Sequence, residues 1–157
     1  QLDDEIIIWA KSKYNLLIGE RTAENLKISI GSALPETRDQ PTESLLRGRD
    51  LRTGLPREIL VTENEIHEAL DKPIRTIIEN IKDTIEETPP ELIADLYQTG
   101  IVLTGGGSLL KRLAERIAIE TQMSVRVDED PLTTVVRGCG QTLEEIDLLE
   151  KVHLAHN

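Results

Sequence analysis

The stretch Gly100-Ile101-Val102-Leu103-Thr104-Gly105-Gly106-Gly107-Ser108 decides the fold of this 157-residue chain. Its first part, residues 101–103, is short and wholly apolar, which is typical of a strand that is covered on both faces. The apolar spacing after the glycines predicts a helix, with Leu109, Leu110, Leu113 and Ile117 facing inward. A buried strand, a glycine turn and a helix in this order indicate an α/β fold.

The glycine turn is also the strongest chemical signal. Because Gly105, Gly106 and Gly107 have no side chains, a ligand can approach the backbone closely, and N–H groups at the start of a following helix favour a phosphate or a sugar. The alternative is a tight turn that binds nothing, and the local pattern alone leaves both open. The turn matches neither a Walker A loop nor the spaced dinucleotide-binding fingerprint.

The residues before the turn predict helices and a hairpin. Helices are expected over residues 2–14 and 20–30, and residues 44–62 predict two strands around a tight turn. Thr62 and Glu65 have the spacing of a capping box, so a long helix is expected to begin there. Its inward stripe is Ile66, Leu70, Ile74, Ile77, Ile81 and Ile85.

Further features are expected within this helix and after it. Pro73 inside it predicts a kink or a restart, and Thr88 is expected to cap another helix. The inward residues of that helix are Leu92, Ile93, Leu96 and Tyr97. Val125 and Val127 predict a strand, and residues 131–141 predict a helix. The expected inward residues of this last helix are Leu132, Val135, Val136 and Cys139. The tail, residues 144–157, is expected to add one short helix.

A second chemical signal lies on the helix at residues 20–30. Glu20, Glu24 and Lys27 are spaced so that they share one helix face. Such a face could hold a purine and a ribose, with the lysine stem over the ring and the carboxylates accepting hydrogen bonds. The alternative is a solvated helix with an ordinary Glu24–Lys27 pair.

Composition excludes several functions. The net charge is −11 and aromatic residues make up 2% of the chain, so neither a phosphate backbone nor stacked bases would be bound, and no nucleic-acid partner is expected. The three histidines lack the spacing of a metal site, and the single cysteine fits a reducing cytoplasm.

There is no signal peptide and no transmembrane run. The chain also lacks a starting methionine, so we expect a piece of a longer protein. Arg47, Arg49, Arg52 and Arg57 make the hairpin basic, as a partner contact or as a solvated surface.

Several segments together resemble the MreB family of bacterial actin-like proteins. They are residues 14–24 (YNLLIGERTAE), 47–51 (RGRDL) with 53–56 (TGLP), 88–92 (TPPEL), 100–107 (GIVLTGGG) and 130–138. They occur in the family's order, and the match covers nearly the whole chain.

The resemblance implies an actin-like ATPase fold, which is ribonuclease H-like, with ATP and Mg²⁺ between two lobes. This chain would supply most of one lobe. Residues 1–32 and 88–157 would form its large α/β subdomain, and residues 33–87 a small inserted subdomain with the hairpin and a helix. Carried over by motif, the nucleotide-binding residues would be Glu20, Ala23, Glu24, Asn25, Leu26 and Lys27 on the helix and Gly105, Gly106, Gly107 and Ser108 at the turn.

The chain departs from the family in what it lacks. The two phosphate-binding hairpins of the family, of the type Asp-x-Gly-Ser/Thr, are absent, so magnesium would be held mainly by the missing half. We therefore expect the full-length protein to hydrolyse ATP and this fragment to be inactive, with no catalytic residue of its own. The missing lobe should also leave apolar faces without partners and a fragment prone to association.

The family also implies partners and a place in the cell. The protein would polymerise with itself into filaments that direct cell shape and peptidoglycan synthesis in cell-wall elongation. It would lie in the cytoplasm at the inner face of the cell membrane, with membrane contacts only through regions absent here. The transmembrane adaptor RodZ and cell-wall elongation proteins would be partners. The alternatives are an Hsp70-like or sugar-kinase nucleotide domain, or an interaction module without a nucleotide.

Overall fold

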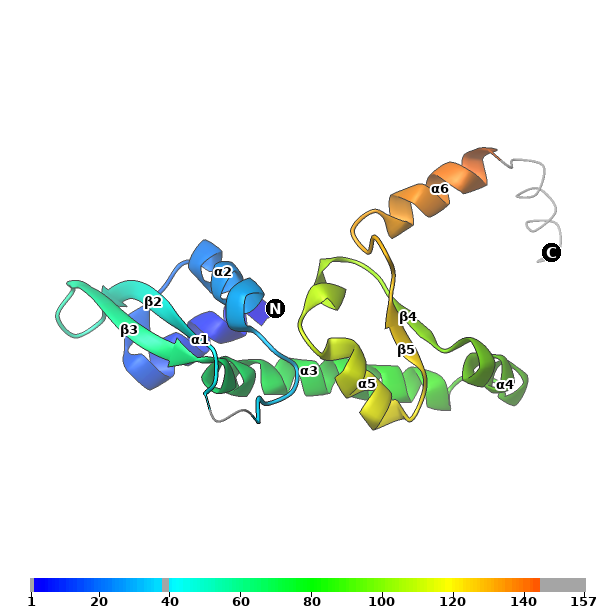
Figure 1. The fold of residues 1–157 in the computed structure, drawn as a ribbon, viewed down its shortest axis with the longest axis horizontal. Helices are drawn as coiled ribbons and strands as arrows, with labels where there is room; N and C mark the ends of the chain where they lie inside the picture. Colours follow the sequence, from blue (N-terminus) through cyan, green and yellow to red (C-terminus); the bar gives the residue numbers. More distant parts are fainter. Residues whose placement is uncertain (1, 38–39, 145–157) are drawn as a thin grey trace.

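The computed structural model describes residues 2–37 and 40–144. The long helix α3 (Glu63–Glu86) runs beneath the other elements, along the longest axis of the view (Figure 1). Along its first half lie α1 (Leu2–Tyr14), α2 (Glu20–Ile30) and a three-stranded sheet, and along its second half lie α5 (Leu113–Thr121) and a two-stranded sheet. The chain is therefore α/β, and the predicted helices at residues 2–14 and 20–30 are confirmed.

The three-stranded sheet is antiparallel, with the strands in the order β1 (Leu16–Leu17), β2 (Glu43–Asp50) and β3 (Pro56–Thr62). The predicted hairpin is confirmed. The strand β1 was not expected, because two residues are too few to show a period of two. Leu46 and Val61 point into the core and are fully buried.

The capping box at the start of α3 is confirmed. The backbone N–H of Glu65 donates to the Thr62 hydroxyl at 3.3 Å, and the backbone N–H of Thr62 donates to the Glu65 carboxylate at 2.9 Å. Burial raises the pKa of Glu65, but hydrogen bonds from the Tyr14 hydroxyl and from Thr62 outweigh it, so that the pKa lies below its ordinary value. The cap thereby ties α1 to α3.

Of the kink or restart expected at Pro73, the restart is wrong, because α3 continues through the proline to Glu86. One missing backbone hydrogen bond is outweighed by burial on both sides of the proline, where Leu70 and Ile74 are fully buried. The next buried position is Ile78 and not Ile77, which is 37% exposed.

The second sheet is a parallel pair, β4 (Ile101–Leu103) and β5 (Val125–Val127). Both strands were predicted. Val102 is nevertheless 42% exposed, so the expectation that both faces of β4 are covered is wrong. The helix α5 packs on this sheet through β5.

A 3₁₀ turn, η1 (Gly106–Leu109), follows the glycines, and α5 begins only at Leu113. Leu110, Leu113 and Ile117 are buried as predicted, whereas Leu109 is 57% exposed. The helix expected after the glycines is therefore divided, because Arg112 takes a left-handed conformation with φ of 59°.

The two helices α4 (Pro90–Thr99) and α6 (Thr134–Glu144) have no buried residue. The predicted inward faces of both are wrong: Leu92 is 55% and Tyr97 65% exposed, while Ile93 and Leu96 are only half-buried. On and before α6, Leu132, Val135, Val136 and Cys139 are all exposed. Figure 1 shows the reason for α6, which projects away from the rest of the described chain.

Two smaller expectations also have an outcome. The Thr88 hydroxyl does not cap α4; it donates to the carbonyl of Thr84 at 2.6 Å, and Pro89 takes the capping position. The helix expected over residues 144–157 lies outside the described residues. No helix in residues 2–37 and 40–144 is long and apolar enough to cross a membrane.

Candidate functional site

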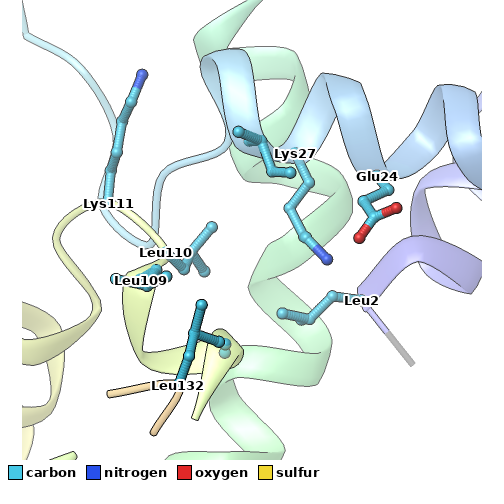
Figure 2. A pocket seen from close by; sticks show the side chains of 10 residues that line it. Leu2, Glu24, Lys27, Leu109, Leu110, Lys111 and Leu132 are labelled. Carbon is cyan, nitrogen blue, oxygen red and sulfur yellow. The ribbon is translucent and has the colours of Figure 1, made fainter. Parts of the chain in front are cut away.

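A cavity of about 520 Å³ separates α2 from the glycine turn. Its lining residues are Leu2, Glu24, Lys27, Ile28, Gly106, Gly107, Leu109, Leu110, Lys111 and Leu132. Figure 2 shows Glu24 and Lys27 on α2 across from Leu109, Leu110 and Leu132. The volume falls within the range of about 300–1,000 Å³ that is usual for small-molecule sites. Two segments about eighty residues apart in the chain thus meet on one cavity.

The helix α2 presents its polar face to this cavity because its apolar face is used in the core. Ala23, Leu26 and Ile30 are buried and pack within the core cluster. Glu24, Lys27 and Ile28 lie on the other side, at the spacing that a helix requires. The core therefore fixes which side chains of α2 a ligand can meet.

The glycine turn is held from within. Gly105 has φ of 79°, a conformation that favours glycine, and its N–H donates to the carbonyl of Pro131 at 2.7 Å. The Ser108 hydroxyl donates to the carbonyl of Gly105 at 2.7 Å, and Ser108 is 6% exposed. Gly106 and Gly107 remain exposed and line the cavity, so the backbone there is open to a ligand.

The main charged contact at the cavity joins α2 to α1. Lys27 Nζ lies 2.8 Å from one carboxylate oxygen of Asp3 and 3.0 Å from the other. The side chains are 22% and 32% exposed, so the pair is partly shielded from water. Lys111 lines the rim, and its ammonium donates to the carbonyl of Ser29 at 2.6 Å.

The structure brings four of the ten predicted site residues together: Glu24, Lys27, Gly106 and Gly107 all line the cavity. The other six do not line it. Ala23 and Leu26 are buried in the core, and Ser108 is buried in the turn. Glu20 and Asn25 are exposed to solvent away from the cavity lining. Gly105 is half-buried and precedes the two glycines that line the cavity.

The prediction missed the apolar lining, namely Leu2, Ile28, Leu109, Leu110 and Leu132, and it missed the contact of Asp3 with Lys27. Nothing in the local spacing of Asp3 indicates a partner 24 residues further on.

The cavity does not fit a magnesium ion by itself. Mg²⁺ requires near-octahedral oxygen ligands, often from more than one carboxylate, whereas Glu24 is the single carboxylate in the lining. No group of three histidine, cysteine, aspartate or glutamate side chains in residues 2–37 and 40–144 could hold a metal ion.

Comparison with known proteins shows to which family the chain belongs. The family model described as MreB/Mbl protein matches residues 1–151. The chain belongs to the MreB/Mbl family. It is 45% identical over 151 residues to the cell shape-determining protein Mbl of Bacillus cereus. This alignment covers 96% of this chain and 45% of that protein. It is 45% identical over 148 residues to the cell shape-determining protein MreB of Escherichia coli, covering 94% of this chain and 42% of that protein. This MreB/Mbl chain thus spans less than half the length of these relatives.

The solved structures of related proteins confirm the actin-like fold. MreB5 of Spiroplasma citri bound to ADP superimposes with a TM-score of 0.86 at 30% identity, over 97% of this chain and 45% of that one. The same protein bound to AMPPNP gives a TM-score of 0.86 at 29% identity, over 98% of this chain and 45% of that one. A MamK double helical filament shares the fold, with a TM-score of 0.73 at 22% identity over 92% of this chain and 43% of that one.

Proposed function

We propose that this MreB/Mbl chain supplies the adenosine side of an ATP site in a polymerising, actin-like cytoskeletal ATPase that directs cell shape. The observation that carries the proposal is the cavity shared by Glu24 and Lys27 of α2 and by Gly106 and Gly107 of the turn. Support comes from the related MreB5 of Spiroplasma citri, which was solved with ADP and with AMPPNP.

The lining suits an adenine nucleotide in its chemistry. Ile28, Leu109, Leu110 and Leu132 give apolar surface for a base, which has little charge of its own. The Glu24 carboxylate accepts hydrogen bonds, and ribose hydroxyls and the adenine amino group donate them. Gly106 and Gly107 leave room for the ribose and the α-phosphate against the backbone.

Hydrolysis would depend on the part of the protein outside this chain. Phosphoryl transfer is catalysed mainly by groups that position magnesium, the terminal phosphates and the attacking water. The cavity has one carboxylate in its lining and does not fit magnesium, so this chain alone would not hydrolyse ATP. The full-length protein would do so.

The wider role follows from family membership. The relatives are named cell shape-determining proteins, so we propose assembly with further copies into filaments, with a role in cell-wall elongation. A cytoplasmic location at the inner face of the membrane, RodZ and wall-elongation proteins as partners, and a division into subdomains at residues 33–87 belong to the same proposal. The match to MreB/Mbl favours it over a chaperone or sugar-kinase domain.

The test is a titration of the ¹⁵N-labelled chain with ATP, followed by NMR. A half-site with a dissociation constant of about 1 mM corresponds to only about 4 kcal/mol, so the titration should extend to about 10 mM. We expect saturable shifts of the Lys27, Gly106 and Gly107 amide signals, and a weaker affinity in Glu24→Gln.

The control is Glu91→Gln, which removes a charge from the exposed face of α4 and should bind ATP as the wild type does. Shifts confined to other elements, or none at all, would leave the chain as an interaction module without a nucleotide.

A further inference from the structure

Lys27 pairs with Asp3, although Glu24 lies much closer to it in the sequence. Lys27 and Glu24 are three residues apart on α2, a spacing at which opposite charges on a helix attract each other. The ammonium of Lys27 nevertheless lies 2.8 and 3.0 Å from the two oxygens of Asp3. Figure 2 shows the lysine reaching toward Leu2, the neighbour of Asp3, beside the Glu24 carboxylate.

This arrangement leaves one charge in the cavity unpaired. Within the described residues, no hydrogen bond or ion pair reaches the Glu24 carboxylate, and Glu24 is exposed. The charge of Lys27 is balanced by Asp3, and the Lys111 ammonium donates to the carbonyl of Ser29 outside the lining. The acceptor left to a ligand at this end is therefore a carboxylate, which suits hydroxyl donors and repels an anion.

We infer that Asp3 is a positioning residue, which pairs with the Lys27 ammonium in place of Glu24 and so keeps the Glu24 carboxylate available to the hydroxyl groups of a sugar. The inference rests on the proposed function, in which that sugar is the ribose of the nucleotide. The position of Asp3 on its helix also supports this positioning role. Asp3 lies in the first turn of α1, where the helix dipole favours a carboxylate, so the anchor for Lys27 is itself stabilised.

The experiment compares ATP with 2′,3′-dideoxy-ATP, which lacks both ribose hydroxyls, in NMR titrations of the full 157-residue chain. The wild type should bind ATP about tenfold more tightly, because hydrogen bonds to a charged acceptor are lost with the analogue. In Asp3→Asn, Lys27 should turn to Glu24, so that ATP affinity falls to that of the analogue while the affinity for the analogue stays unchanged.

Three further variants separate positioning from a structural effect. Asp3→Glu should keep the preference for ATP, and Asp4→Asn removes a charge from the same helical turn and should also keep it. The double variant Asp3→Asn with Lys27→Met should regain the preference, even at lower affinity, because nothing then pairs with Glu24.

Each outcome decides the inference. Equal losses for both nucleotides in Asp3→Asn indicate a structural role and overturn it. An equal affinity of the wild type for both nucleotides also overturns it and leaves the proposed function intact. Should Asp3→Asn not fold, Glu24→Gln decides, since a preference for ATP that survives in this variant contradicts the inference. A wild type that binds neither nucleotide overturns the proposed function and the inference with it.

Discussion

Asp50 and Arg57 form an ion pair across the β2–β3 hairpin, with Arg57 Nη1 3.1 Å from Asp50 Oδ2. The other oxygen of Asp50 accepts from the backbone N–H groups of Arg52 and Thr53 at 2.8 and 3.1 Å. The guanidinium of Arg57 also donates to the carbonyl of Tyr14 at 3.1 Å. One nearly buried carboxylate thereby orders the hairpin turn and ties it to the end of α1.

Asp50→Asn should destabilise the chain at neutral pH and flatten its stability in acid. The backbone N–H groups of Arg52 and Thr53, and then Arg57, hold the pKa of Asp50 below its ordinary value of 3.8. The ionised form therefore stabilises the fold above that value, and the contribution is lost as the pH falls through the lower folded-state pKa. Urea unfolding at pH 7 and between about pH 4 and pH 2 measures the difference. Asp95→Asn, on the exposed face of α4, is the control. An unchanged acid dependence in Asp50→Asn would contradict the assignment.

Gly48→Ala should destabilise the three-stranded sheet. A Cβ at this position would lie 2.5 Å from the carbonyl oxygen of Leu17, 2.8 Å from the Leu16 side chain and 2.9 Å from that of Ile18. The backbone of β1 cannot move away without breaking its pairing with β2, so we expect a loss of about 1–3 kcal/mol in the free energy of unfolding. Gly138→Ala on α6 meets no atom within 4 Å and should not lower stability. A melting temperature for Gly48→Ala equal to that of the wild type would show that β1 does not lie against Gly48.

Arg116 and Arg75 both contact Asp71, and their loss should differ in cost. Arg116 is 14% exposed and lies 3.4 Å from Asp71, and it also donates to the carbonyl of Ala33 at 3.3 Å. Arg75 is 61% exposed and pairs with Asp71 one helical turn away. We expect Arg116→Ala to cost about 1–3 kcal/mol, because the carbonyl of the buried Ala33 loses a charged donor. Arg75→Ala should cost less than about 0.5 kcal/mol, as exposed pairs usually do. Urea unfolding of the two variants measures both values, and equal losses would contradict the distinction.

Local interactions account for most of what the sequence predicted. The capping box of Thr62 and Glu65 closes within four residues, and the cavity face of α2 follows from the spacing of Glu24 and Lys27. The wrong or missed predictions concern which elements pack against each other. The apolar spacing of Val135 and Val136 shows which side of α6 is apolar, but it does not show whether anything covers that side, and both are exposed. The contact of Asp3 with Lys27 was missed for the same reason, because it depends on how α1 and α2 pack.

Gly107→Val should weaken nucleotide binding without disturbing the fold. A Cβ on Gly107 meets no atom within 4 Å, and the residue has no left-handed backbone that a side chain would strain. The valine would instead occupy the cavity beside Gly106, where we propose that the ribose and α-phosphate lie. The melting temperature should stay within about 2–4 °C of the wild type, while ATP affinity falls at least about tenfold, because a steric clash replaces a close backbone approach. Gly140→Val places the same side chain on α6, outside the cavity lining, and should leave affinity unchanged. If Gly107→Val binds ATP as tightly as the wild type does, the nucleotide does not use this side of the turn.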